Sequence, residues 1–89
     1  MIINRTARFK RAFKKLPLHI QKDFFKNIKI FMQDYKNPRL RTHKLRGQME
    51  ECYAFCLRDG FRVLFEFNGN NEINLIAIGP HDYYKRWSR

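Results

Sequence analysis

Three strand-like segments in the second half of the chain constrain its fold more than any other feature. The segments 49–58 and 61–67 alternate large apolar residues with small or polar ones, and this period of two is typical of strands with one buried face. The segment 73–78 is almost continuously apolar, as expected for a strand inside a sheet. The polar stretches 59–60 and 68–71 predict turns, so the three segments should form an antiparallel sheet.

Side-chain parity predicts the register of the first hairpin. A three-residue loop over 58–60, with its glycine in the left-handed region, places Phe55 opposite Val63 and Cys56 opposite Arg62. A two-residue loop would mix the apolar and polar faces. We therefore predict the three-residue loop.

The predicted register makes Arg62 a candidate ligand-binding residue. It places the guanidinium on the face away from the aromatic core, beside the small side chains of Ala54 and Cys56. This position leaves room for a planar or anionic ligand. The alternative is a structural ion pair with Glu66 or Glu51 on the same face, and the sequence leaves both interpretations open.

Apolar residues at helical spacing predict two helices before the sheet. The first follows Thr6, a candidate N-cap, and ends at 16–17; the second runs over 18–35. Ile2 and Ile3 predict a short first strand, and Asp82 could cap a last helical turn. The expected fold class is α+β: a small, mainly antiparallel four-stranded sheet with two N-terminal helices packed on one face and a short C-terminal helical turn.

The length and residue usage indicate one domain over residues 1–89. The sequence contains neither an apolar run of transmembrane length nor a signal peptide, so we expect a cytoplasmic protein without a membrane partner. Cys52 and Cys56 lie about 13 Å apart on one predicted strand, too far for a disulfide. Cysteine and histidine show no zinc-site spacing, so we expect free thiols, no metal and no cofactor.

The net charge of +11 is the strongest compositional signal. Residues 1–49 contain fourteen Lys and Arg against two Asp, whereas residues 50–89 contain five Lys and Arg against six acidic residues. This imbalance favours a polyanionic partner, and nucleic acid is the commonest polyanion of the cytosol. A solvated basic surface or an acidic protein partner would also account for it.

Two polar segments beside the predicted sheet are candidate sites. The basic segment 39–47 leads into the first long strand, and ligand contacts are often made by such loops. After Gly79 and Pro80 stop the last strand, His81 is followed closely by aromatic residues. A histidine beside an aspartate is, however, more often a surface or capping residue than a catalyst.

The order and spacing of these motifs resemble the RelE/ParE toxin superfamily of type II toxin-antitoxin systems, and its RelE-like mRNA interferase branch in particular. The resemblance rests on the motifs at 15–17, 43–47, 61–66 and 78–82. It implies a metal-independent endoribonuclease that cleaves mRNA at the ribosome and inhibits translation. In this chemistry the ribose 2′-hydroxyl attacks the adjacent phosphate. The resemblance also implies an acidic antitoxin that binds the toxin in a hetero-oligomeric complex.

The resemblance also implies roles for individual residues. Arg62 matches the strand arginine that binds the scissile phosphate, and His81 would act as acid, base or phosphate ligand. His43 matches a position where some members carry a catalytic histidine. Tyr84, with Tyr83 as the alternative, resembles the C-terminal aromatic residue that stacks or shares in proton transfer. The implied RNA-binding residues are Lys44, Arg46, Arg41, Arg58, Tyr83 and Lys85.

The chain departs from this pattern on the first long strand. Ala54 and Cys56 stand where some ribosome-dependent members carry lysines. The base would then be His43, His81 or Glu66. Two alternative functions remain: a ParE-like gyrase inhibitor without nuclease activity, and a catalytically weak, basic RNA-binding protein of the same fold.

Overall fold

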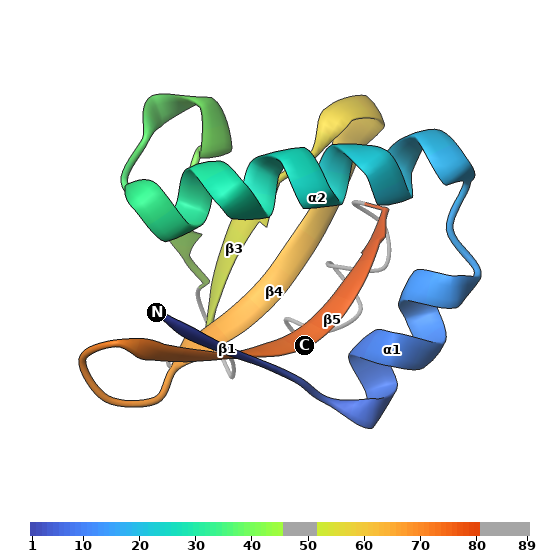
Figure 1. The fold of residues 1–89 in the computed structure, drawn as a ribbon. Coiled ribbons are helices and arrows are strands. Elements are labelled where there is room, and N and C mark those ends of the chain that lie inside the picture. The colour runs from blue at the N-terminus through green and yellow to red at the C-terminus, as the bar shows by residue number, and fades with distance from the viewer. Residues whose placement is uncertain (46–51, 81–89) are drawn as a thin grey trace.

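A mixed five-stranded sheet forms the centre of the protein. The computed structural model describes residues 1–45 and 52–80 of the 89. The strands are β1 (Ile2–Arg5), β2 (His43–Lys44), β3 (Tyr53–Cys56), β4 (Phe61–Phe67) and β5 (Glu72–Pro80). Their spatial order is β1-β5-β4-β3-β2, and β1 runs parallel to β5 while the other neighbours are antiparallel (Figure 1).

The prediction of four strands was wrong by one strand. His43 and Lys44, expected in a loop, pair with Ala54 and Tyr53 as the edge strand β2. Leu45 extends the pairing through a 2.9 Å hydrogen bond from its N–H to the carbonyl of Cys52. A two-residue strand is too short to show alternation, so the sequence pattern could not reveal it. The predicted C-terminal helical turn lies outside the described residues.

The predicted register of the first hairpin is confirmed. Phe55 lies opposite Val63, and Cys56 lies opposite Arg62. The three-residue loop forms a short 3-10 turn, η3 (Arg58–Gly60). Its second and third residues are both left-handed, with φ of 58° at the aspartate and 77° at the glycine. The sequence pattern predicts this conformation only at the glycine.

Two α-helices precede most of the sheet, as predicted. They are α1 (Ala7–Lys14) and α2 (Leu18–Gln33), so α2 ends two residues before its predicted limit. A short 3-10 helix, η1 (Pro38–Leu40), leads from α2 towards β2. Within the described residues, no helix is long and apolar enough to span a membrane.

The main hydrophobic core lies between the two helices and one face of the sheet (Figure 1). Phe31 of α2 is 1% exposed and packs against Phe55 and Phe65, with ring centroids 5.2 and 5.0 Å away. Phe9 of α1 joins the same core through Phe24, at 5.5 Å. Both helices therefore cover the same face, as predicted.

The opposite face of the sheet carries a smaller apolar cluster. Its buried members are Leu45, Cys52, Ala54, Leu64 and Ala77. The pairings Leu64 with Ala77 and Phe65 with Leu75 leave one extra residue, Ile76, in β5. This β-bulge reverses side-chain parity along β5, so the strand contributes residues to both clusters. The bulge explains why β5 has no simple alternation in the sequence.

Thr6 joins α1 to the sheet, and its substitution should test that joint. Its hydroxyl accepts a 3.1 Å hydrogen bond from the N–H of Phe9 and donates a 2.9 Å bond to the carbonyl of Leu75. We expect Thr6→Val to lower the free energy of unfolding by about 1–2 kcal/mol, because the shape is kept while the cap is lost. Urea unfolding followed by circular dichroism measures the change. Thr6→Ser keeps the hydroxyl and should lie within about 0.5 kcal/mol of wild type; equal losses in both variants would contradict this role.

Candidate functional site

A polar stripe on α2 lies along the end of β3 and the η3 turn. Its members, His19, Asp23 and Asn27, are spaced four residues apart and therefore share one side of the helix. Asn27 donates to the carbonyl of Cys56 at 3.5 Å, and Asp23 accepts from the N–H of Arg58 at 2.9 Å. The ring of His19 lies 3.0 Å from a carboxylate oxygen in the turn.

This stripe compensates for the shortness of β2. Among the described residues, β2 pairs with Tyr53 and Ala54 alone, so the edge of β3 beyond them is bordered by α2 instead. Asn27 is 8% exposed and also donates to Asp23 at 3.2 Å, so the buried amide is well bound. A groove remains between α2, η1 and the β3–β4 hairpin.

The groove has a volume of about 510 Å³ and a predominantly basic lining. Its cationic residues come from three separate segments: Lys26, Arg39, Arg41, Arg58 and Arg62. Two carboxylates, those of Asp23 and Asp59, also line it. The formal charge of these side chains is therefore +3, from five cations and two anions. Such a concave, cationic surface attracts phosphate groups and other anions.

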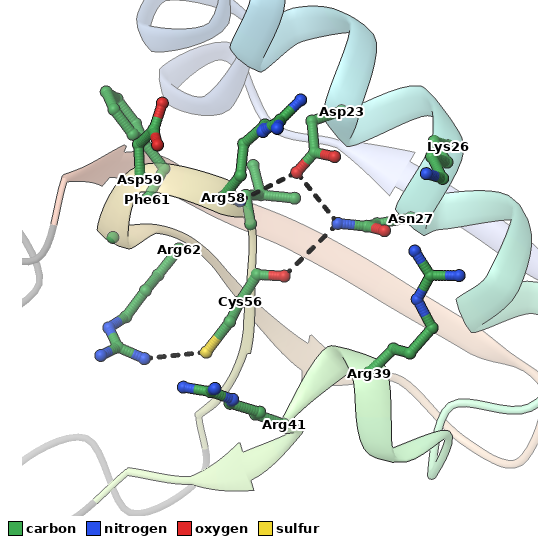
Figure 2. Close-up of a pocket in the computed structure, with 12 residues that line it drawn as sticks. Asp23, Lys26, Asn27, Arg39, Arg41, Cys56, Arg58, Asp59, Phe61 and Arg62 are labelled. Atoms are coloured by element: carbon green, nitrogen blue, oxygen red, sulfur yellow. Dashed lines mark hydrogen bonds between the residues drawn. The ribbon is translucent and has the colours of Figure 1, made fainter.

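Arg62 lies half-buried where β4 faces β3. Its Nη1 donates a 2.9 Å hydrogen bond to Sγ of Cys56, the residue opposite it in the sheet. Figure 2 shows Arg41 and Arg62 on the same side of Cys56, Lys26 on α2, and the side chain of Arg39 extending toward that helix. The small cross-strand neighbour orients the guanidinium and leaves space in front of it, as the sequence predicted.

The alternative ion pair with Glu66 is disfavoured by its position. Glu66 lies four residues along β4 from Arg62, about 13 Å away by standard strand geometry. Its carboxylate accepts a 3.1 Å hydrogen bond from Asn74, which stands opposite it on β5. Glu51 lies outside the described residues, so the pair with that residue is untested.

Arg41 has a left-handed backbone that influences a neighbouring histidine. Its φ and ψ are 49° and 39°, a conformation in which a side chain is strained. Its carbonyl lies 2.8 Å from Nδ1 of His43. Because a carbonyl can only accept, Nδ1 must carry the proton, and Nε2 is the basic nitrogen of the neutral ring.

His43 does not line the groove that contains Arg62. It lines a second hollow together with Tyr35, Lys36, Thr42, Lys44, Tyr53 and Phe67. In the sheet His43 lies opposite Ala54, two residues from the pair formed by Cys56 and Arg62. Standard sheet spacings put the Cα atoms of His43 and Arg62 roughly 12 Å apart.

The structure therefore brings together part of the predicted site. Arg41, Arg58 and Arg62 share the groove, whereas His43 and Lys44 line the second hollow. The other predicted residues lie outside the described part of the chain: Arg46, His81, Tyr83, Tyr84 and Lys85.

Sequence reasoning missed several residues of the groove. The sequence pattern gives Lys26 no role in a site, and it places Arg39 in the basic segment 39–47 without a role of its own. Asp23 and Asn27 were not singled out, although three polar residues at four-residue spacing beside an apolar stripe were a usable signal.

Ala54, the cysteines and the acidic and histidine side chains bear on what else the described residues could contribute to a site. Ala54 is 0% exposed inside the smaller apolar cluster, so this position contributes no polar group. Both thiols are free, with Cys52 buried and Cys56 partly exposed. Over residues 1–45 and 52–80, no three histidine, cysteine or acidic side chains come together as a metal site would require.

Comparison with known proteins identifies the fold. No protein-family model matches the chain, and no curated protein sequence matches it significantly. Solved structures do match. The YoeB/ParE toxin from Agrobacterium tumefaciens superposes with a TM-score of 0.77 at 12% identity, over 91% of this chain and 99% of that one.

Two structures of toxins with their antitoxins match as well. The RelB–RelE complex of Methanococcus jannaschii gives a TM-score of 0.75 at 18% identity, covering 97% of this chain and 99% of the matched chain. The intact RelBE complex of E. coli gives 0.69 at 20% identity, covering 89% and 94%. The chain therefore has the fold of the RelE/ParE-like toxin superfamily.

The effect of the strained backbone at Arg41 on stability can be separated from the effect of its charge by comparing two variants. We expect Arg41→Gly to be more stable than Arg41→Ala by about 1 kcal/mol, because glycine adopts the left-handed conformation without steric cost. Both variants lose the same guanidinium. Urea unfolding of the pair measures the difference; a more stable alanine variant would show that residue 41 is not left-handed in solution.

Proposed function

We propose that the chain is a single toxin domain, residues 1–89, of a type II toxin-antitoxin pair and that it cleaves mRNA at the ribosome. The reaction needs no metal and stops translation in the cytoplasm. The observation that supports this proposal most strongly is the convergence of Arg41, Arg58 and Arg62 on one groove at the edge of a rigid sheet. Arginine on a fixed strand is well suited to bind a phosphate through several N–H donors.

In the proposed reaction, Arg62 binds the scissile phosphate. The ribose 2′-oxygen attacks phosphorus, a base takes its proton, and the 5′-oxygen leaves with a proton from an acid. The products are a 2′,3′-cyclic phosphate and a free 5′-hydroxyl. Arg62 would stabilise the charge that grows on the phosphoryl oxygens, an effect strongest in a groove with fixed donors.

His43 is our proposed base, since Nε2 is its basic nitrogen once Nδ1 bonds to the carbonyl of Arg41. His81 and Tyr84 are proposed as the acid and the stacking group, on the resemblance of the C-terminal motif. Glu66 is a weaker candidate because Asn74 binds its carboxylate away from Arg62.

An acidic antitoxin is the proposed protein partner. The matching solved structures include complexes of RelE-type toxins with their antitoxins and a structure of E. coli RelE with a peptide of its antitoxin. A chain of net charge +11 would favour an acidic partner, and a hetero-oligomeric complex would cover part of the basic surface.

A second candidate function is binding without cleavage. His43 and Arg62 line different hollows, and Ala54 is buried where some members carry a lysine. A gyrase inhibitor of the ParE type or a weak RNA-binding protein would not need a catalytic base, such as His43, close to Arg62. These two readings predict intact transcripts in cells that stop growing.

Replacement of Arg62 tests the nuclease proposal directly. We expect Arg62→Ala to lower the cleavage rate by about 10²–10³-fold, the usual cost of removing a donor that stabilises a transition state. Transcripts are mapped after brief induction without antitoxin, and wild type should yield fragments with 5′-hydroxyl ends inside translated regions. Arg5→Ala, which removes an exposed arginine from β1 at the opposite edge of the sheet, is the matched control. Unchanged cleavage by folded Arg62→Ala, or growth arrest with whole transcripts, would overturn the assignment.

Replacement of His43 tests the base. Asn can keep a donor near the carbonyl of Arg41 but has no basic nitrogen, so we expect His43→Asn to lower the single-turnover rate by roughly 10²–10⁴-fold. Its affinity for a non-cleavable RNA should stay within a few-fold of wild type. If cleavage by His43→Asn is undiminished, the base lies elsewhere, and the same assay on His81→Asn and Glu66→Gln locates it.

A further inference from the structure

A second hollow, separate from the arginine groove, combines aromatic rings with lysines. Its volume is about 340 Å³. Its rings come from Tyr35, two residues after α2, from Tyr53 of β3 and from Phe67 of β4, and all three are half-buried. Each ring therefore keeps some surface open to a ligand.

The rings are held rigidly by one another. Phe67 contacts Tyr35 and Tyr53 edge to face, with centroids 5.4 and 5.1 Å away. Tyr53 also stacks on the buried Phe65, with ring centroids 5.8 Å apart and an interplanar angle of 25°. Thr42, directly before β2, donates a 2.7 Å hydrogen bond to the carbonyl of Tyr35 and so connects the turn after α2 to the start of β2. A ligand would meet a preformed aromatic wall.

The charges around these rings are positive. Lys36 and Lys44 are exposed, and the ammonium of Lys36 lies 5.7 Å from the centroid of Tyr35. No acidic side chain is among the described residues that line the hollow. Asp34 is close in sequence, but its carboxylate accepts a 3.0 Å hydrogen bond from the backbone N–H of Lys36.

We propose that this hollow binds one nucleotide of a single-stranded RNA, outside the reacting pair. Its base packs on Tyr53 and Phe67, and its phosphate lies between Lys36 and Lys44. Aromatic rings interleaved with cations are the usual means of binding single-stranded nucleic acid, since every base has a π-face and every nucleotide a phosphate. The inference rests on the proposed function in taking RNA as the partner.

The chain connects this nucleotide site to the arginine groove. Arg41 lines the groove, and the next two residues, Thr42 and His43, line the hollow. β2 is the edge strand, so an RNA strand can pass around it from one site to the other. Standard sheet spacings put the Cα atoms of Lys44 and Arg62 roughly 14 Å apart.

The features of the hollow favour RNA over an acidic peptide. A base and its phosphate match a small site of fixed rings with cations at its rim. An acidic peptide would satisfy the lysines but needs no exposed ring surface. RNA duplex is excluded as the occupant, because its paired and stacked bases cannot present a face to the rings.

The test uses a short single-stranded RNA that is 2′-O-methylated at every position and cannot be cleaved. Fluorescence anisotropy measures its affinity for the full chain. We expect Tyr53→Leu and Lys44→Ala to weaken binding by about 5-fold or more each. Tyr53→Phe, which keeps the ring, should bind within about 2-fold of wild type. Lys10→Ala removes one exposed positive charge from α1 and is the matched control.

A second measurement separates the contribution of base stacking to RNA binding from the contribution of charge. A fluorescent base analogue, 2-aminopurine, is placed at each position of the same RNA in turn. One position should be quenched on binding, and this quenching should be lost in Tyr53→Leu but kept in Arg62→Ala. Circular dichroism and urea unfolding establish that each variant is folded.

The outcomes distinguish this inference from the proposed function. If wild type binds the RNA and folded Tyr53→Leu and Lys44→Ala bind it equally well, the nucleotide site is wrong while the arginine groove stands. If wild type binds no RNA, the nucleotide site is wrong, and the transcript mapping after induction decides separately whether the chain is a nuclease. If Lys44→Ala weakens binding as little as Lys10→Ala does, the lysines act through general charge, and the site is again wrong.

Discussion

The contact between the polar stripe of α2 and the end of β3 determines where a ligand can bind. Asp23 and Asn27 bond to the backbone of Arg58 and Cys56, at an edge of the sheet where β2 gives no further pairing. Buried backbone groups must find partners, and here a helix supplies them in place of a strand. Because α2 side chains bond to the edge of β3 without covering it, an open groove remains beside this strand.

The aromatic core makes this contact possible by fixing the position of α2. Phe31 lies between Phe55 and Phe65, and such ring pairs contribute about 0.5–1.5 kcal/mol each beyond the area they bury. A helix held by these rings has little freedom to slide along the sheet. Lys26, on this helix, is therefore held in a fixed position at the groove.

The concentration of positive charge opposes folding, and an anionic partner would relieve it. Five cationic side chains share the groove with two carboxylates. Arg41 adds backbone strain of about 1–2 kcal/mol by its left-handed conformation. Strain and like-charge repulsion at the same place are common at binding sites, where the ligand supplies the compensating interactions. The charged groove, lined by Arg41, and the aromatic hollow, lined by the next three residues, would then engage different parts of one RNA strand.

The sequence by itself determined the helices, the three long strands and the register of Cys56 with Arg62, because these follow from side-chain periodicity within a segment and from the length of one turn. It therefore placed Arg62 correctly on the sheet. Only the tertiary structure decided that Lys26 and Arg39 join Arg62, that His43 lies in a different hollow, and that β5 changes parity at a bulge. These features depend on how separate segments cross and pack, and residues distant along the chain carry no local pattern that reports their distance in space.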